Sequence, residues 1–220
     1  MGSRTRRGGR ATVSVRPPLP RLHAITDDRI ARRPDLHRLA QTIATAGGQH
    51  VALHVRAPGV PGLDLYRMAR DFAELSPASL FVNDRLDIAL ACGAVGVQLT
   101  RTSLPVASAR RLCAAWWIGC SVHSYDQATA ARNAGADYLV AGPAYATPTH
   151  PDQAPLGSRT LEEIVRLGLP VVAIGGITPE RGRELAAAGV YGVAAIRSIW
   201  DAPDPALVVR DFLGDRDQRE

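Results

Sequence analysis

Between residues 22 and 212, short apolar runs alternate strictly with longer amphipathic segments, eight of each. The strand candidates are residues 22–26, 50–56, 80–83, 96–99, 118–123, 138–141, 171–175 and 192–196. Alternation of strand and helix indicates a parallel sheet, and eight repeats of the unit indicate that the sheet closes on itself. The sequence therefore predicts an α/β fold, a single (β/α)8 TIM barrel, with its chemistry at the carboxyl ends of the strands.

Two segments of unusual composition flank the predicted barrel, which should occupy residues 22–213. Residues 1–21 hold six of the 26 arginines, together with Gly, Ser and Pro and few large apolar residues, so we expect them to be disordered. We interpret this segment as a leader outside the domain rather than a mitochondrial presequence, because it lacks apolar residues at helical spacing. Residues 214–220 form a charged tail.

Charge and hydropathy exclude two classes of partner. The six arginines of residues 1–21 leave 20 arginines against 21 acidic residues in the rest of the chain, so the folded part has no basic excess for nucleic acid. The chain has no run of 18 apolar residues and no secretory signal, which predicts a cytoplasmic protein that does not enter membranes. The oligomeric state is not set by the sequence, which leaves a homo-oligomer open.

Two consecutive loops are candidates for binding phosphate. Gly175 and Gly176 follow the seventh predicted strand, and Arg197 and Ser198 follow the eighth. In barrels of this kind, backbone N–H groups of these two loops approach phosphate oxygens closely, and glycine permits that approach. The Ser198 hydroxyl would add a donor, and Arg197 offers a guanidinium fork, unless it forms an ion pair on the surface.

Three further candidates lie at the ends of the second and fifth strands. His123 shares a strand face with Ser121, which directs it into the mouth of the barrel, where an imidazole can move protons near neutral pH. The alternative is a structural histidine bonded to a neighbouring loop. His54 and Arg56 share a face of the second strand and would place an imidazole and a permanent cation beside the site, unless one of them turns away at Pro58.

The third and sixth strands end in polar residues. Asn83 and Asp84 supply an amide and a carboxylate that could orient a substrate, although Asp84 could instead cap the following helix. One carboxylate rarely holds Mg²⁺ without help from substrate phosphates. Thr147 and Thr149 lie in a loop that is long for its place between strand and helix, as substrate-binding loops often are.

In combination and order, these segments resemble the thiamine phosphate synthase and TenI-like superfamily, whose members are (β/α)8 proteins of thiamine biosynthesis. The resemblance extends from about residue 22 to residue 212, and its motifs lie at residues 81–89, 96–99, 121–124, 135–138, 142–149 and 174–177. The synthase branch joins a pyrimidine pyrophosphate to a thiazole phosphate. Resemblance to that branch implies that Mg²⁺ and a departing pyrophosphate must be held.

Three synthase motifs are altered in this chain, which contains no lysine. The pattern Gln-x-Arg-x-Lys reads His-Val-Arg-Ala-Pro at residues 54–58. In the pattern Thr-x-Thr-Lys, the lysine is replaced by His150. The pattern His-Leu-Gly-Gln-Glu-Asp reads Gln-Leu-Thr-Arg-Thr-Ser at residues 98–103. Ser103 therefore stands where the synthase pattern has an aspartate that resembles a Mg²⁺ ligand. Arg101 could replace one lysine, but serine cannot replace a carboxylate for a hard cation. These departures disfavour synthase activity.

The resemblance then implies a thiazole tautomerase of the TenI type, an isomerase that needs no metal or cofactor and takes a thiazole phosphate-type molecule. In this interpretation His123 is the general acid and base, His54 a second proton carrier, and Arg56 the clamp for the substrate carboxylate. Asn83 and Asp84 support them. The alternatives are a Mg²⁺-dependent thiamine phosphate synthase and a non-catalytic or regulatory protein that binds a phosphorylated ligand.

Overall fold

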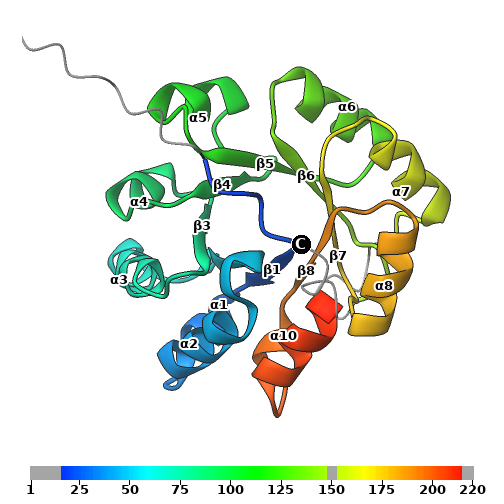
Figure 1. The fold of residues 1–220 in the computed structure, drawn as a ribbon. Helices are drawn as coiled ribbons and strands as arrows, with labels where there is room; N and C mark the ends of the chain where they lie inside the picture. Colours follow the sequence, from blue (N-terminus) through cyan, green and yellow to red (C-terminus); the bar gives the residue numbers. More distant parts are fainter. Residues whose placement is uncertain (1–15, 148–152, 215–220) are drawn as a thin grey trace, which may run out of the picture.

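The computed structural model describes residues 16–147 and 153–214 of the chain. Eight parallel strands close into a barrel in sequence order, with β8 paired to β1. The strands are β1 (Leu22–Ile25), β2 (Val51–Val55), β3 (Ser79–Asn83), β4 (Gly96–Leu99), β5 (Trp117–Val122), β6 (Tyr138–Ala141), β7 (Val171–Ile174) and β8 (Gly192–Ala195). Figure 1 shows this ring of strands with the helices outside it. The predicted (β/α)8 barrel is confirmed, and no strand end differs from its predicted position by more than one residue.

Helices connect the strands and cover the outside of the barrel. They are α1 (Asp28–Ala31), α2 (Leu36–Gly47), α3 (Gly62–Ala73), α4 (Leu86–Ala91), α5 (Val106–Leu112), α6 (Tyr125–Asn133), α7 (Ser158–Val165), α8 (Pro179–Ala187), α9 (Arg197–Trp200) and α10 (Pro205–Leu213), with the 3-10 turn η1 (Gly48–His50). The sequence pattern did not anticipate α1 and α9, because a four-residue turn is too short to show helical periodicity. None of the helices in the described ranges combines the length and hydropathy needed to cross a bilayer.

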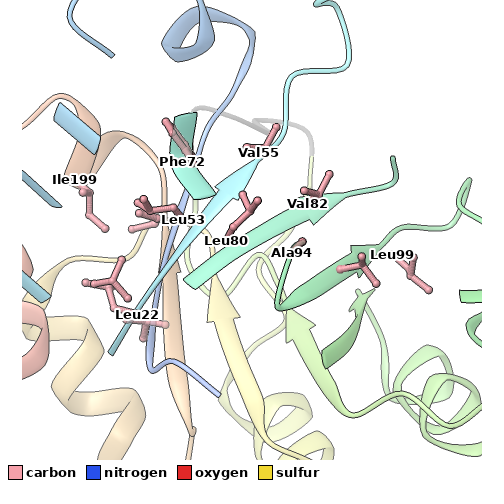
Figure 2. Packing of buried hydrophobic residues seen from close by; sticks show 14 of the residues in the cluster. Leu22, Leu53, Val55, Phe72, Leu80, Val82, Ala94, Leu99 and Ile199 are labelled. Atoms are coloured by element: carbon pink, nitrogen blue, oxygen red, sulfur yellow. The ribbon is translucent and has the colours of Figure 1, made fainter. Parts of the chain in front are cut away.

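The main hydrophobic core lies between the barrel and its helices. On β2 and β3, Leu53, Val55, Leu80 and Val82 are buried on the outer face of the strands, and Phe72 of α3 belongs to the same cluster (Figure 2). Because side chains alternate along a strand, the residues between them point into the barrel. The same alternation therefore builds the outer core and delivers the residues of the interior.

Aromatic rings fill the interior of the barrel. Phe81 and Tyr138 are fully buried there and meet edge to face, with ring centroids 6.2 Å apart. The space comes from two glycines on the intervening strands, since a Cβ at Gly96 would overlap the Phe81 ring and one at Gly119 would overlap the Tyr138 ring. A barrel packed in this way leaves room for a ligand only at its end.

Residues 16–21, which the sequence places in the disordered leader, cross the amino-terminal end of the barrel (Figure 1). Leu19 is 4% exposed, and its carbonyl accepts a hydrogen bond from the Tyr191 hydroxyl. The Trp117 indole donates to the Pro17 carbonyl at 2.9 Å, and the Arg16 guanidinium stacks over the Trp117 ring at 3.5 Å. The packed part of the chain therefore begins before residue 22. Residues 1–15 and 215–220 lie outside the described residues.

Candidate active site

A cavity of about 1150 Å³ opens at the carboxyl ends of the strands. Seven of the eight strands contribute to its wall, from Ile25 of β1 through Asn83 and Gln98 to Ala194 of β8, and β2 contributes through Arg56, the residue that follows it. Its location agrees with the rule for (β/α)8 barrels. Its volume lies slightly above the usual range of about 300–1,000 Å³ for pockets that hold one small ligand.

Arginine dominates the electrostatics of this cavity. Arg56, Arg101, Arg181 and Arg197 line it, while no aspartate or glutamate among the described residues does so. Arg181 is engaged, since it donates to the Gly176 carbonyl at 2.5 Å and lies over the Tyr145 ring. The other three guanidiniums make no hydrogen bond or ion pair within residues 16–147 and 153–214. Three uncommitted cations in one cavity predict ligands that carry several negative charges.

The two predicted phosphate loops meet at this cavity. Gly175 and Gly176 have φ angles of 101° and 64°, and a Cβ on Gly175 would overlap Pro143 of the neighbouring loop. Glycine is therefore required by the backbone at this turn. Arg197 and Ser198 form the first turn of α9 and also line the cavity. The geometry brings the four residues together, and their contact with phosphate stays a prediction.

His123 lies exposed at the cavity wall, as its strand position predicted. Its Nδ1 lies 2.6 Å from the Gly142 carbonyl oxygen, and its backbone N–H donates to Gln127. A carbonyl oxygen can only accept, so Nδ1 carries a proton, and Nε2 is the acceptor whenever the ring is neutral. His123 therefore does both: it bonds a neighbouring loop, as the predicted alternative said, and it lines the cavity.

Asp84 is held by residues of the next loop rather than by its own helix. Its Oδ1 accepts hydrogen bonds from the Thr100 hydroxyl at 2.8 Å and from the Ser103 hydroxyl. Helix α4 begins at Leu86 without a side-chain cap, so the alternative that Asp84 caps this helix is wrong. Asp84 has a φ of 61°, a strained value for a residue other than glycine, and its hydroxyl partners fix this conformation.

Part of the candidate site lies outside the cavity. Asn83 and Thr147 line it, whereas Thr149 lies outside the described residues. His54 is 0% exposed and does not line the cavity. It lies two residues before Arg56 and therefore deeper in the barrel. There its Nε2 lies 2.8 Å from His23 Nδ1, and its Nδ1 lies 2.9 Å from Asn83 Oδ1. In this position His54 cannot touch a ligand directly.

Burial also sets the protonation of this histidine pair. Burial lowers the pKa of His54 to about 4, and it lowers the pKa of His23 well below 6.5, an effect that the neighbouring His54 increases. Both rings are therefore neutral at pH 7, because a buried imidazolium would lose its hydration without gaining a counter-ion.

Acid should destabilise the fold through these two rings. An unfolded chain protonates His54 near pH 6.5. The folded barrel resists protonation down to about pH 4, so the stabilisation is complete above pH 6.5 and is lost as the pH falls toward 4. From His54 alone, we expect the free energy of unfolding to fall by about 2 kcal/mol between pH 7 and pH 5. Urea denaturation at each pH measures the free energy of unfolding. A His54→Gln variant should show a weaker dependence of this free energy on pH, whereas the control His37→Gln, at an exposed site, should not. A profile that is unchanged in His54→Gln would contradict this assignment.

Two functional candidates were not foreseen from the sequence. Arg181 reaches the cavity from the first turn of α8, and Gln98 reaches it from β4, where it donates to the Ser121 hydroxyl at 3.0 Å. The inward parity of Gln98 could have been recognised from strand alternation. Arg181 could not have been recognised in this way. The sequence gives the spacing of a residue along its helix, but it does not show which loop the side chain contacts.

A preformed metal site is not evident in the described part of the chain, which has no cluster of three or more His, Cys, Asp and Glu side chains. Asp84 supplies one carboxylate, with the hydroxyl oxygens of Thr100 and Ser103 beside it. Asp84 and Ser103 do not line the cavity, but Thr100 does, so they lie next to its wall. Magnesium is commonly held by one or two carboxylates together with substrate phosphates. These residues fit an ion that arrives with a pyrophosphate, and they do not fit an ion held by protein alone.

Fold and site together define a (β/α)8 barrel with an arginine-rich ligand cavity at the carboxyl ends of its strands. Residues 22–199 match the family described as thiamine monophosphate synthase. A thiamine-phosphate synthase of Methanoculleus marisnigri is 40% identical over 200 residues, which cover 87% of this chain and 92% of that protein. A bifunctional thiamine biosynthesis protein of Symbiobacterium thermophilum is 44% identical over 72% of this chain, although the match spans 34% of its own length.

A solved structure agrees with these matches. The thiamine phosphate pyrophosphorylase of Pyrococcus furiosus superposes with a TM-score of 0.76 at 31% identity, over 88% of this chain and 93% of that one. The chain belongs to the thiamine monophosphate synthase family, and this places it among the enzymes of thiamine biosynthesis.

The interpretation of the chain as a TenI-type tautomerase is wrong. Relatives that match almost the whole barrel are thiamine-phosphate synthases, which was the alternative. The missing lysines and the missing acid do not amount to a loss of function. The cavity instead holds three arginines whose guanidiniums have no partner among the described residues, so cationic charge is present although the residue type and positions differ. The proton-carrier role given to His54 fails separately, because the ring is buried beneath the cavity.

Proposed function

We propose that this protein is a thiamine-phosphate synthase, a transferase that joins a pyrimidine pyrophosphate to a thiazole phosphate and releases pyrophosphate. The observation that carries the proposal is the charge of the cavity: the guanidiniums of Arg56, Arg101 and Arg197 have no protein partner in the described residues, and no described acid lines the wall. Both substrates are polyanions, and the cavity of about 1150 Å³ has room for both. Family membership of residues 22–199 supports the same activity.

The reaction forms one bond and breaks one. The thiazole nitrogen shares its electron pair with the methylene carbon on the pyrimidine, and the bond from that carbon to the pyrophosphate oxygen breaks. The electron pair of the broken bond leaves with the pyrophosphate. Arginines fixed around the departing group stabilise this charge more strongly in the transition state than in the bound substrate. We assign this role to Arg56 and Arg101, and the thiazole phosphate to Gly175, Gly176, Arg197 and Ser198.

His123, Asn83, Asp84 and the threonines complete the proposed site. His123 presents Nε2 at the cavity wall as an acceptor, and Asn83 presents one end of its amide from the floor. Thr147 and Thr149 would supply hydroxyl donors. Asp84, with Ser103, would hold a magnesium ion together with the pyrophosphate, and the ion would neutralise part of the charge that builds up on it.

Restoring a second carboxylate beside Asp84 should strengthen the response to magnesium. In a Ser103→Asp variant, two carboxylates would replace one carboxylate and a hydroxyl, and we expect the Mg²⁺ concentration for half-maximal activity to fall about 10-fold. Without metal, repulsion between the two acids should lower the melting temperature, and added Mg²⁺ should restore it. Ser103→Asn, which adds no charge, is the matched control. An unchanged Mg²⁺ response in the aspartate variant would show that the ion does not bind at Asp84.

Product formation tests the proposed function directly. Purified protein is incubated with hydroxymethylpyrimidine pyrophosphate, thiazole phosphate and Mg²⁺, and the release of thiamine phosphate and pyrophosphate is followed with time. We expect equal amounts of the two products and no reaction when either substrate is omitted. Binding of both substrates by folded protein without release of pyrophosphate would overturn the proposal and favour a non-catalytic phosphate-binding relative.

A further inference from the structure

A line of hydrogen bonds runs through the barrel interior and ends at the floor of the cavity. His23 Nε2 lies 3.0 Å from the Pro20 carbonyl oxygen, and His23 Nδ1 lies 2.8 Å from His54 Nε2. At the other end, His54 Nδ1 lies 2.9 Å from Asn83 Oδ1. Both histidines are 0% exposed, whereas Asn83 lines the cavity. The line therefore connects the buried interior to a residue that a ligand can touch.

The Pro20 carbonyl determines the direction of this line. A carbonyl oxygen can only accept, so His23 Nε2 carries the proton. A neutral imidazole has one N–H, which leaves His23 Nδ1 bare and able only to accept from His54 Nε2–H. By the same argument, His54 Nδ1 is bare. Each ring fixes the tautomer of the next.

These tautomers exist only if both rings are neutral, and the surroundings of the rings favour the neutral form. The rings pack against the rings of Phe81 and Tyr138, with His54 stacked on Phe81 at 5.0 Å between centroids. In the described part of the chain, no carboxylate contacts either imidazole. A cation without a counter-ion is disfavoured in such a place. Burial lowers the pKa of both rings in agreement with this.

A bare His54 Nδ1 needs a donor, and Asn83 is the group that faces it. The oxygen and the NH2 group of an amide exchange places by a half-turn about χ2, so the hydrogen-bond line decides which of them faces His54. An amide oxygen at 2.9 Å from a bare ring nitrogen would set two acceptors against each other. The NH2 group therefore faces His54, and the carbonyl oxygen is the end that Asn83 turns to the cavity.

We infer that His23 and His54 are positioning residues, which hold the Asn83 carbonyl oxygen toward the cavity so that this point of the site accepts a hydrogen bond from an N–H group of the ligand. The chemical identity of the ligand rests on the proposed function. On a pyrimidine substrate, the matching donor is an amino group attached to the ring. A ring nitrogen without hydrogen, which can only accept, is rejected at the same point.

Nitrogen-15 NMR of the full-length protein without ligand tests the line of hydrogen bonds. Long-range correlations between ring protons and ring nitrogens distinguish the two neutral tautomers and the cation. We expect His23 and His54 at pH 7 to be protonated at Nε2 and bare at Nδ1, each assigned through correlations to its own side chain. An Nδ1-protonated His54, or an imidazolium, would overturn the inference. This result does not depend on the enzymatic activity.

Kinetics test the consequence for the substrate. In a His54→Leu variant Asn83 loses its partner, and we expect KM for the pyrimidine pyrophosphate to rise about 10-fold while KM for the thiazole phosphate stays unchanged. His54→Gln should restore the first KM, since its carbonyl can accept from Asn83 and its amide nitrogen can donate to His23. Tyr138→Phe is the matched control, because it alters the same buried layer at a hydroxyl that has no hydrogen-bond partner in the described residues.

The possible results separate the inference from the proposed function. Equal rises of both KM values in His54→Leu, or no rescue by glutamine, would show that His54 has a structural role alone, and would overturn the inference. If the unsubstituted protein does not catalyse the transfer, the proposed function fails, and the NMR result still decides whether the histidines orient Asn83. If His54→Leu does not fold, the NMR result and the glutamine variant decide it.

Discussion

The Arg56→Ala variant is expected to lower kcat/KM for the pyrimidine pyrophosphate about 10²–10³-fold, the range found when one donor to a developing anion is removed from an active site. Arg56 lines the cavity, and its guanidinium has no protein partner in the described residues, so under the proposed function its charge is available to the departing pyrophosphate. Its backbone is fixed on both sides by Thr26, whose hydroxyl donates to the Arg56 carbonyl at 3.0 Å and accepts from its N–H at 2.9 Å. The side chain therefore starts from a fixed point on the cavity wall.

Two further variants show whether the effect belongs to the guanidinium fork. Arg56→Lys keeps one positive charge but loses the paired donors, so we expect a loss of about 10-fold. Arg159→Ala removes an arginine whose side chain is 92% exposed on α7, and it should leave kcat/KM unchanged. Steady-state rates of pyrophosphate release measure all three. A loss of less than threefold in Arg56→Ala would show that this arginine does not contact the departing group.

The Trp200→Ala variant is expected to lower the free energy of unfolding by about 3–5 kcal/mol, the usual result of truncating a large buried aromatic residue. Trp200 is 0% exposed at the end of α9 and stacks on Phe72 of α3, with ring centroids 6.2 Å apart. Urea denaturation should show a lower midpoint with an unchanged slope. The void left by the missing ring lowers the stability without changing the surface exposed on unfolding.

Trp200→Phe separates the ring from its N–H group. Within the described residues the buried indole N–H has no hydrogen-bond partner, so its removal offsets part of the volume that phenylalanine leaves empty. We expect a change within about 1 kcal/mol of the unsubstituted protein. If alanine and phenylalanine destabilise the protein equally, the packing of the ring is not the source of the stability.

The backbone of the candidate site follows from the sequence because its determinants are local. Apolar runs separated by amphipathic segments predicted all eight strands to within one residue. Strand parity predicted that His123 reaches the cavity, and the glycine pair at residues 175 and 176 marked a turn that only glycine can adopt without a clash. Each of these features depends on neighbours within a few positions of the chain.

Depth along the barrel is not a local property. His54 and Arg56 share a strand face, but they are two residues apart and thus about 6.6 Å apart along the strand, at about 3.3 Å per residue. This distance places His54 among buried rings and Arg56 in the cavity. The level at which the cavity floor lies depends on the rings that fill the barrel, such as Phe81 and Tyr138, and on the glycines opposite them.

The sequence by itself determined the (β/α)8 barrel, the end of the barrel that carries the site, and the superfamily, because strand alternation, helix periodicity and ordered motifs are properties of one chain read from end to end. The tertiary structure decided which residues share the site: Asp84 meets Thr100 and Ser103 of the next loop, and Arg56, Arg101 and Arg197 come together from the segments that follow β2, β4 and β8. Comparison of single residues with a motif therefore detects the absence of a lysine or an acid at one position, but not the charge supplied by residues elsewhere in the chain. The chemistry of a polyanion depends instead on the total charge around it in space, and only the closed barrel brings that charge together.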